Sequence, residues 1–336
     1  MTDSPIARHS PPKAQRGWER LFWILVVLVG AGYVLVGYAV FDIMFSGGPR
    51  HKSGVMALSF LVALPFSLSA VVVYKITRHK ERRFWRAFFI ALTSLMLAII
   101  LSILIFGEGI ICILLAVVPA LMACLIGAII GWCMSYSRKR YTGRLMSIGL
   151  LLPFVLGAWE HQMVPPDHIA TVTRSVYINA PAQNIWQEIL SPDHIRSNEV
   201  EGGIAYRIGV PVPLSAQMEG EGVGAIRHSA WGRGVMFDEE VVAWEENRYI
   251  AWKYHFRDDS FPSGSLDDHI KVGGTYFDLM DTSYRLTPKD GGTQLDISIR
   301  FRITTGFNWY AGLIGDTLIG DTAMTLLEFY RKRTEV

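Results

Sequence analysis

The residues best suited to acid–base chemistry are Asp278, His255 and Tyr284, in the C-terminal half of the chain. Alternation along residues 275–286 predicts one strand face made of Tyr276, Asp278, Met280, Thr282, Tyr284 and Leu286. If this face lines a cavity, burial would raise the pKa of the Asp278 carboxyl toward that of a general base. The same carboxylate could instead cap a backbone group near the sheet edge, so both interpretations stay open.

Histidine and glutamate positions do not form a metal site or a carboxylate pair. His228, His255 and His269 lack the spacing of metal ligands and have no cysteine near them in sequence. Glu239 and Glu240 are adjacent on a predicted strand, so they point to opposite faces and cannot act together. We therefore expect no metal here.

Two further motifs resemble binding loops only superficially. The glycines at positions 220, 222 and 224 lack the preceding strand and following helix of a dinucleotide-binding loop, so no cofactor is expected. Asp258, Asp259, Asp267 and Asp268 resemble a calcium loop only in their charge, and we interpret the stretch as a solvated lid.

One predicted strand has an aromatic face. Trp252, Tyr254 and Phe256 alternate with polar residues, a pattern that fits a lipid pocket or an ordinary core. Residues 293–304 should present Leu295, Ile297, Ile299, Phe301 and Ile303 inward. The expected cavity residues are Trp252, Tyr254, Phe256, Tyr276, Met280, Tyr284, Leu295, Ile297, Trp309 and Leu313.

These residues require a domain over residues 165–336. It should open with a strand over 171–178, a turn at Pro181 and a helix carrying Ile185, Trp186 and Ile189, then a possible short second helix through Arg196. About six antiparallel strands follow, over 206–213, 222–231, 235–244, 248–256, 275–287 and 293–304. A helix over 307–333 closes the chain, and it is long enough to cover the open sheet face. Its Gly312, Gly315 and Gly320 disfavour helix, which indicates a bend, a close contact with a ligand, or poor packing.

The N-terminal half has the composition of a membrane bundle. After an arm over residues 1–20 that we expect to be disordered, apolar runs at 21–45, 54–74, 84–106, 110–134 and 145–164 predict about five spans. The last is the shortest and carries Pro153, so it could be re-entrant instead. Asp42 and Glu108 lie near span ends, and Gly127 and Gly131 form a close-packing pair, so we expect an anchor and not a transporter.

Loop charge predicts the orientation. Lysine and arginine gather in the N-terminal arm and in residues 75–86 and 138–144, which places the N-terminus in the cytoplasm. Five crossings then put the C-terminal domain outside, which is the periplasm if the membrane is a bacterial inner membrane. If the fifth segment does not cross, the domain is cytoplasmic.

Composition agrees with this division. The 336 residues are 51% hydrophobic and 18% charged, and the formal net charge of +2 gives no reason to expect a nucleic-acid partner. Cys112, Cys124 and Cys133 all lie in one apolar segment, so no disulfide framework holds the C-terminal domain.

The run Val176 to Trp186, VYINAPAQNIW, resembles the opening signature of the SRPBCC superfamily, in its polyketide-cyclase/dehydrase and lipid-transport branch. Later segments resemble that superfamily's motifs in the same order: GVGAIR at 222–227, EVVAWEE at 240–246, YRLTP at 284–288 and GGTQL at 291–295. The resemblance covers residues 169–336. It implies the helix-grip fold of START-type and birch-pollen-allergen-like domains, an antiparallel sheet wrapped around a long C-terminal helix with a hydrophobic cavity, but no single activity.

The sequence supports three hypotheses of function. The first is a membrane-anchored carrier or sensor of a hydrophobic small molecule or lipid, without catalysis. The second is a cyclase- or dehydrase-like enzyme on a hydrophobic substrate, with Asp278, His255 or Tyr284 in acid–base roles. The third is a non-catalytic module that assembles an envelope complex.

Overall fold

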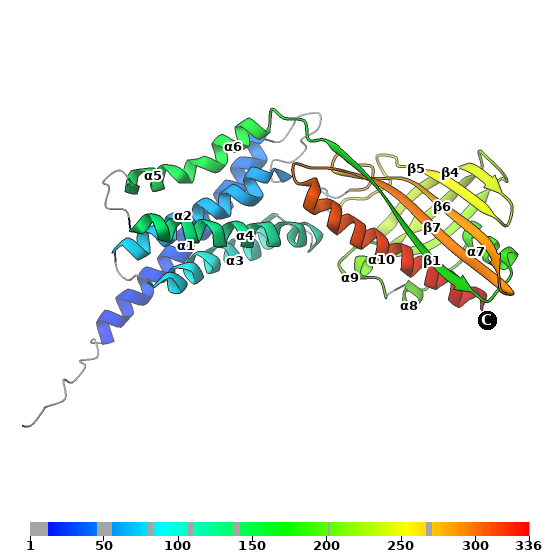
Figure 1. Cartoon of the computed structure of the whole chain (residues 1–336), viewed down its shortest axis with the longest axis horizontal. Helices are drawn as coiled ribbons and strands as arrows, with labels where there is room; N and C mark the ends of the chain where they lie inside the picture. Colours follow the sequence, from blue (N-terminus) through cyan, green and yellow to red (C-terminus); the bar gives the residue numbers. More distant parts are fainter. Residues whose placement is uncertain are drawn as a thin grey trace, which may run out of the picture. The chain divides into compact units, whose positions relative to one another are not determined.

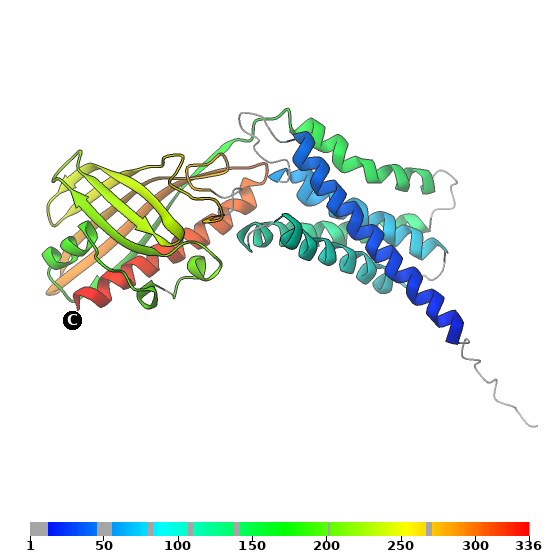
Figure 2. The same ribbon diagram turned by 180° about the vertical axis from the view of Figure 1, so that it is seen from behind.

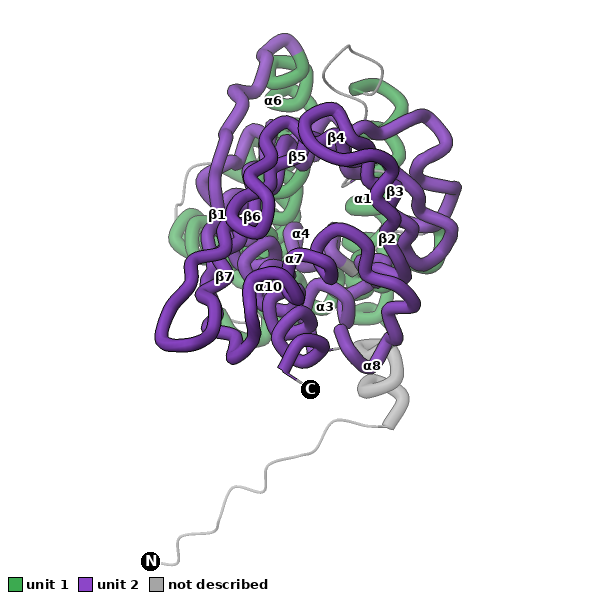
Figure 3. Tube along the Cα trace, turned by 90° about the vertical axis from the view of Figure 1, so that its right-hand side faces the viewer, with its two compact units in different colours: residues 1–46, 58–107, 117–161 green, residues 47–57, 108–116, 162–336 purple. Residues whose placement is uncertain are grey.

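The computed structural model describes residues 13–45, 56–79, 83–106, 110–136, 142–200, 202–266 and 271–335. Most of the N-terminal arm, Glu108, Asp267, Asp268 and His269 lie outside these ranges. Contacts divide the chain into two compact units (Figure 3): residues 1–46, 58–107 and 117–161 form the first, and 47–57, 108–116 and 162–336 the second.

The first unit is built of long apolar helices. They are α1 (Lys13–Phe45), the π-helical turn η2 (Ser59–Ala63) that continues into α2 (Leu64–His79), α3 (Phe84–Phe106), α4 (Ile110–Ser135), α5 (Thr142–Ile148), the short turn η3 (Gly149–Leu151) and α6 (Leu152–Glu160). Five segments, 21–45, 59–78, 84–106, 111–135 and 142–160, are long and apolar enough to cross a membrane, which indicates a multi-pass membrane protein.

Small residues and one carboxylate organise this unit. A Cβ at Gly127 or Gly131 of α4 would lie 2.3 or 2.2 Å from a backbone oxygen of α2, so the glycine pair lets the two helices approach closely as expected. The last span ends at Glu160, four residues before the predicted Val164. Its carboxylate accepts hydrogen bonds from the Leu58 and Ser59 amides at 2.7 and 2.8 Å, and so satisfies free N–H groups at the start of η2.

The second unit contains a seven-stranded antiparallel sheet of order β1-β7-β6-β5-β4-β3-β2 (Figures 1 and 2). Its strands are β1 (Asp167–Ile178), β2 (Pro213–Glu219), β3 (Ile226–Trp231), β4 (Val235–Glu245), β5 (Tyr249–His255), β6 (Phe277–Lys289) and β7 (Gly292–Thr304). Its helices are α7 (Ala182–Leu190), α8 (Ser197–Val200), α9 (Ile204–Arg207) and α10 (Asn308–Thr334), and the turn η4 (Gly232–Gly234) joins β3 to β4. This arrangement is consistent with a helix-grip fold.

Turn residues with positive φ make the hairpins possible. The β3–β4 turn has Arg233 at φ 58° and Gly234 at φ 75°, and the β6–β7 turn has Asp290 at 47° and Gly291 at 85°. Asp tolerates this left-handed region and glycine adopts it freely, so Asp290, Gly291 and Gly234 follow the usual preferences of turn residues, whereas Arg233 does not.

The long helix α10 packs against β1 and β7 and also contacts α7, α8 and α9. Its C-terminal half buries Ala323, Leu327, Phe329 and Tyr330 in the main core, where α7 contributes Ile185, Trp186 and Ile189. Arg333 then joins the end of α10 to the preceding helices, through Glu199 at 2.9 Å and Glu188 at 3.3 Å. The basic last turn therefore forms specific ion pairs in addition to matching the helix dipole.

The strand predicted over residues 206–213 is wrong, since only its last residue, Pro213, belongs to a strand, the first residue of β2. Tyr206 lies in the helix α9, and Ile208 is the C-cap residue of that helix. The α9 backbone is held by Asp321 of α10, whose carboxylate accepts from the Ile204 and Ala205 amides. Asp321, which lies more than a hundred residues further along the chain, thus fixes this segment as the start of a helix.

Candidate functional site: an apolar cavity with one buried ion pair

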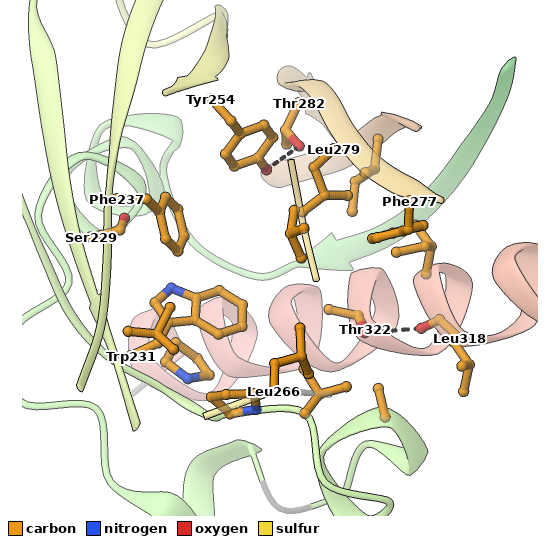
Figure 4. A pocket seen from close by; sticks show the side chains of 18 of the residues that line it. Ser229, Trp231, Phe237, Tyr254, Leu266, Phe277, Leu279, Thr282, Leu318 and Thr322 are labelled. Atoms are coloured by element: carbon orange, nitrogen blue, oxygen red, sulfur yellow. Dashed lines mark hydrogen bonds between the residues drawn. The ribbon is translucent and has the colours of Figure 1, made fainter. Parts of the chain in front are cut away.

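A cavity of about 230 Å³ lies between the sheet and α10. Strand residues lining it include Trp231, Val235, Phe237, Trp252, Tyr254, Phe277, Leu279, Thr282, Tyr284, Ile299 and Ile303. From α10 come Ala311, Ile314, Gly315, Leu318, Ile319, Thr322, Leu326, Phe329 and Tyr330. Figure 4 shows Phe237, Trp231 and Leu279 arranged around the open space above α10. Most of this lining is apolar, which suits a hydrophobic ligand.

Five of the ten expected cavity residues line this space. They are Trp252, Tyr254, Phe256, Tyr276 and Tyr284. Aromatic contacts join several of them: the Tyr254 and Phe256 rings are stacked with centroids 5.8 Å apart, and Trp252 lies 5.3 Å from Tyr284. The aromatic face of β5 is therefore partly cavity wall and partly core.

The other five expected cavity residues lie elsewhere. Leu295 and Ile297 are fully buried in the core cluster, beyond the cavity wall. Met280 does not line the cavity. Trp309 and Leu313 are 74% and 64% exposed, because the helical period of α10 turns Ala311, Ile314 and Leu318 inward instead.

A β-bulge at Met280 explains why the alternation predicted for β6 is wrong in its first half. Leu279 pairs with Phe301 and Asp281 with Arg300, so Met280 is an extra residue in β6. Beyond the bulge Thr282 and Tyr284 face the cavity, as expected from the sequence. Before it, Phe277 and Leu279 face inward, and this moves Asp278 to the opposite face.

Asp278 consequently does not point into the cavity. Burial raises the pKa of its carboxyl, and the charge of Arg302 and backbone groups of Gly273 and Leu279 oppose this rise. The Arg302 guanidinium lies 3.9 Å from the carboxylate. These contacts match the backbone-capping interpretation of Asp278.

The three candidate acid–base residues are not brought together. His255 is exposed on the outer face of the sheet, 2.7 Å from the Glu240 carboxylate. Tyr284 alone lines the cavity, and burial raises its pKa well above the usual value, so it stays a neutral phenol. Among the residues that the structure describes, no cluster of His, Cys, Asp or Glu is placed to hold a metal ion.

The polar centre of the cavity is an ion pair between Arg227 and Glu239. These residues lie directly opposite each other on β3 and β4, and their side chains are only 8% and 5% exposed. The Arg227 Nη1 donates to Glu239 Oε2 and to Ser229 Oγ, and the Ser229 hydroxyl donates to the same carboxylate oxygen at 2.7 Å. The Arg227 Nε donates to the Leu190 carbonyl at 3.2 Å.

One further contact holds the arginine in position. Its Cζ lies 4.9 Å from the centre of the Trp252 ring, within range of a cation–π interaction. Burial has the largest single effect and would lower the pKa of Arg227, but the charge and hydrogen bond of Glu239 together with the nearby Tyr330 and Tyr284 outweigh it, so the pKa is raised and the guanidinium stays charged.

Sequence reasoning missed this pair, although a signal was present. Alternation from Val235 through Phe237 places Glu239 inward, and the inward positions of β3 include Arg227 and Ser229. A charged residue at an inward position on each of two neighbouring strands is rare without a partner, and that coincidence predicts an ion pair. The prediction that Glu239 and Glu240 face opposite ways is confirmed, since Glu239 is buried and Glu240 is partly exposed.

A second polar pair lies further along the wall. The Tyr254 hydroxyl is 2.6 Å from the Thr282 hydroxyl (Figure 4), and burial raises the Tyr254 pKa. One hydroxyl donates to the other, so a single O–H donor of this pair remains for a further partner.

Comparisons with known proteins find no matching family model and no matching curated protein. Among solved structures, a point mutant of norcoclaurine synthase from Thalictrum flavum has 10% identity and a TM-score of 0.32, over 50% of this chain and 96% of its own. Protein MLL2253 from Mesorhizobium loti has 17% identity and a TM-score of 0.30, over 50% of this chain and 100% of its own. TTHA0849 from Thermus thermophilus has 16% identity and a TM-score of 0.31, over 49% and 97%. Likenesses at this level carry no argument about what this chain binds.

Proposed function

We propose that this protein is a membrane-anchored binding protein, a carrier or sensor, for a hydrophobic small molecule or lipid. The observation that carries the proposal is the apolar cavity between the sheet and α10, whose wall is mostly aliphatic and aromatic. Burying an apolar ligand there would gain about 25 cal/mol for each Å² removed from water.

Attachment to the membrane gives such a cavity a nearby lipid source. The last apolar helix ends at Glu160 and β1 begins at Asp167, seven residues later. Even a fully extended connection of this length reaches only about 24 Å. The start of the domain therefore cannot move farther than that from the end of the last apolar helix.

A non-catalytic role fits the placement of the polar residues. His255 and Asp278 do not line the cavity, which removes two of the three groups that a cyclase- or dehydrase-like mechanism would use. No contact among the described residues of the second unit favours the envelope-assembly hypothesis over ligand binding.

Mass spectrometry of lipids retained by the full-length protein tests this function. Leu318 lines the cavity, so Leu318→Trp should fill part of it and reduce the retained lipid. Leu313→Trp is the matched control, because it makes the same substitution on the same helix at an exposed position. Equal lipid retention by both variants, or no specific lipid on the unaltered protein, would contradict the proposal.

We also propose that the domain lies on the outer side of a bacterial inner membrane, with the N-terminus in the cytoplasm. The support is the predicted number of crossings and the basic residues Lys75, Arg78, Arg83 and Arg86 around the second loop. A C-terminal alkaline phosphatase fusion should be active, and a C-terminal fluorescent protein that folds only in the cytoplasm should be dark. The reverse pattern would place the domain in the cytoplasm.

A further inference from the structure

The buried ion pair retains two hydrogen-bonding positions that no protein group uses. Within the described part of the chain, Arg227 bonds through Nε and Nη1, and no hydrogen bond reaches Nη2. Glu239 accepts through Oε2, and none reaches Oε1. Some buried polar side-chain atoms of the described residues are fully shielded from solvent and have no hydrogen-bond partner. Arg227 Nη2 and Glu239 Oε1 are not among them, so both atoms retain some accessible surface.

That open space is the cavity, because Arg227, Ser229 and Glu239 all line it. The free donor and the free acceptor thus belong to two paired side chains that line the ligand site and are more than nine-tenths buried. Unused hydrogen-bonding capacity at such a position is costly unless a ligand or water satisfies it.

The charge of the pair limits the ligand. Arg227 and Glu239 together are neutral, so a neutral ligand group leaves their balance unchanged. A carboxylate would bring a second negative charge beside Glu239 in a medium of low dielectric constant, where repulsion is strong. An ammonium group would likewise bring a second positive charge beside Arg227 and be repelled.

Hydrogen-bonding chemistry narrows the ligand further. A hydroxyl both accepts and donates, so a single one can accept from Arg227 Nη2 and donate to Glu239 Oε1. A ketone, ester or ether can only accept, and would leave the carboxylate oxygen unsatisfied. The rest of the cavity wall requires an apolar body.

Resting on the proposed function, we infer that the ligand is an uncharged hydrophobic alcohol whose hydroxyl binds between Arg227 and Glu239. Its hydrocarbon part extends along α10, whose lining residues run from Ala311 to Tyr330. At 1.5 Å per residue this stretch of helix is about 28 Å long, enough for an extended chain.

The test compares four probes with the same twelve-carbon chain: dodecan-1-ol, 1-methoxydodecane, dodecanoate and dodecane. Binding of radiolabelled probe to the full chain in phospholipid nanodiscs is measured, and empty nanodiscs supply the partition background. The alcohol should bind about tenfold to a hundredfold more tightly than the ether, since one hydrogen bond to a charged group is lost. The affinity of the alcohol should also exceed the affinities of dodecanoate and dodecane by at least the same factor.

A charge variant supplies a second readout. Glu239→Gln keeps a hydrogen-bond acceptor beside Arg227 but leaves the site with a net positive charge. Dodecanoate should then bind at least about tenfold more tightly than it does to the unaltered protein, and the preference for the alcohol should shrink. Glu240→Gln, one residue away on the outer face, is the matched control and should change nothing.

Each outcome separates the two proposals. Dodecanoate binding the unaltered protein as tightly as the alcohol would overturn the inference, and so would equal binding of all four probes, although the cavity function would survive both. If no probe binds above the empty-nanodisc background, the proposed function itself fails. If Glu239→Gln does not fold, the comparison of the four probes on the unaltered protein is still enough to test the inference.

Discussion

Replacing Arg227 with methionine should destabilise the second unit strongly, because it leaves the Glu239 carboxylate buried without its cation. The carboxylate would keep only the Ser229 hydroxyl as a hydrogen-bond donor. Removing one partner of a buried pair costs about 3–5 kcal/mol, out of a total stability of about 5–15 kcal/mol for a typical domain. The double variant Arg227→Met/Glu239→Leu, which removes both charges, should recover most of that loss.

A matched control exists on the outer face of the same sheet. Arg300 pairs with Asp281, but these side chains are 45% and 27% exposed. Solvent screens such a pair, so Arg300→Met should cost no more than about 1 kcal/mol. The contrast between the two arginine variants isolates the effect of burial.

Urea titration of the full chain in detergent measures these differences. Trp186, Trp231, Trp244 and Trp252 all lie in the second unit, and their fluorescence should report its unfolding. The slope of free energy against urea should be the same for every variant, so that midpoint shifts represent stability. A loss below about 1 kcal/mol for Arg227→Met, or a double variant less stable than both single ones, would refute the reasoning.

Three further predictions follow from the second unit. Hydrogen bonds to Asp238 and Glu219 raise the pKa of His228, so the charged imidazole stabilises the fold below about pH 6.5, and this stabilisation is lost as the pH rises through the higher folded pKa. In urea titrations His228→Gln should therefore cost more stability at pH 6 than at pH 9. A cost that does not change with pH would contradict this. Gly320→Ala should be neutral or stabilising by up to about 1 kcal/mol, because the added Cβ meets only the movable end of the Arg174 side chain. Gly315→Ala should gain less stability, because its Cβ would lie 2.8 Å from Ile303 and 3.0 Å from Phe301. Thermal melts of the two variants compare these stabilities. Deleting Met280 should remove the bulge but keep Leu279 paired with Phe301 and Asp281 with Arg300, so Phe277 and Leu279 should still face the cavity and ligand should still be retained. Asp278→Asn should also leave retention unchanged, and lipid mass spectrometry checks both variants; a loss of retention in either would contradict this register.

Much of the fold could be predicted because its signals are local. The inward alternation of β7 from Leu295 to Ile303 is uninterrupted, and every one of those positions is buried. Turn residues at 232–234 and 290–291 separate the strands, and α10 ends within one residue of the expected position. In each case the chain's own periodicity and the preferences of its turn residues agree.

The remaining errors come from interactions that sequence periodicity does not contain. No residue type at Met280 marks it as a bulge, since the extra residue is defined only by pairing with β7. The helix α9 depends on Asp321, far along the chain. The importance of Glu239 depends on its being opposite Arg227, and that register is a property of the folded sheet. Local sequence patterns predict the strands, whereas the pairing of residues between strands determines which side chains meet in the cavity.

The two ends of α10 differ in a way that bears on ligand exchange. The C-terminal part buries Leu327 and Tyr330 and is tied down through Arg333, whereas the N-terminal part carries Gly312 and Gly315. Amide hydrogens of the C-terminal part should exchange slowly, and those of the glycine-bearing part faster, because each glycine lowers the local helix stability by about 1 kcal/mol. Local opening of the glycine-bearing end would then release a ligand without global unfolding of the domain.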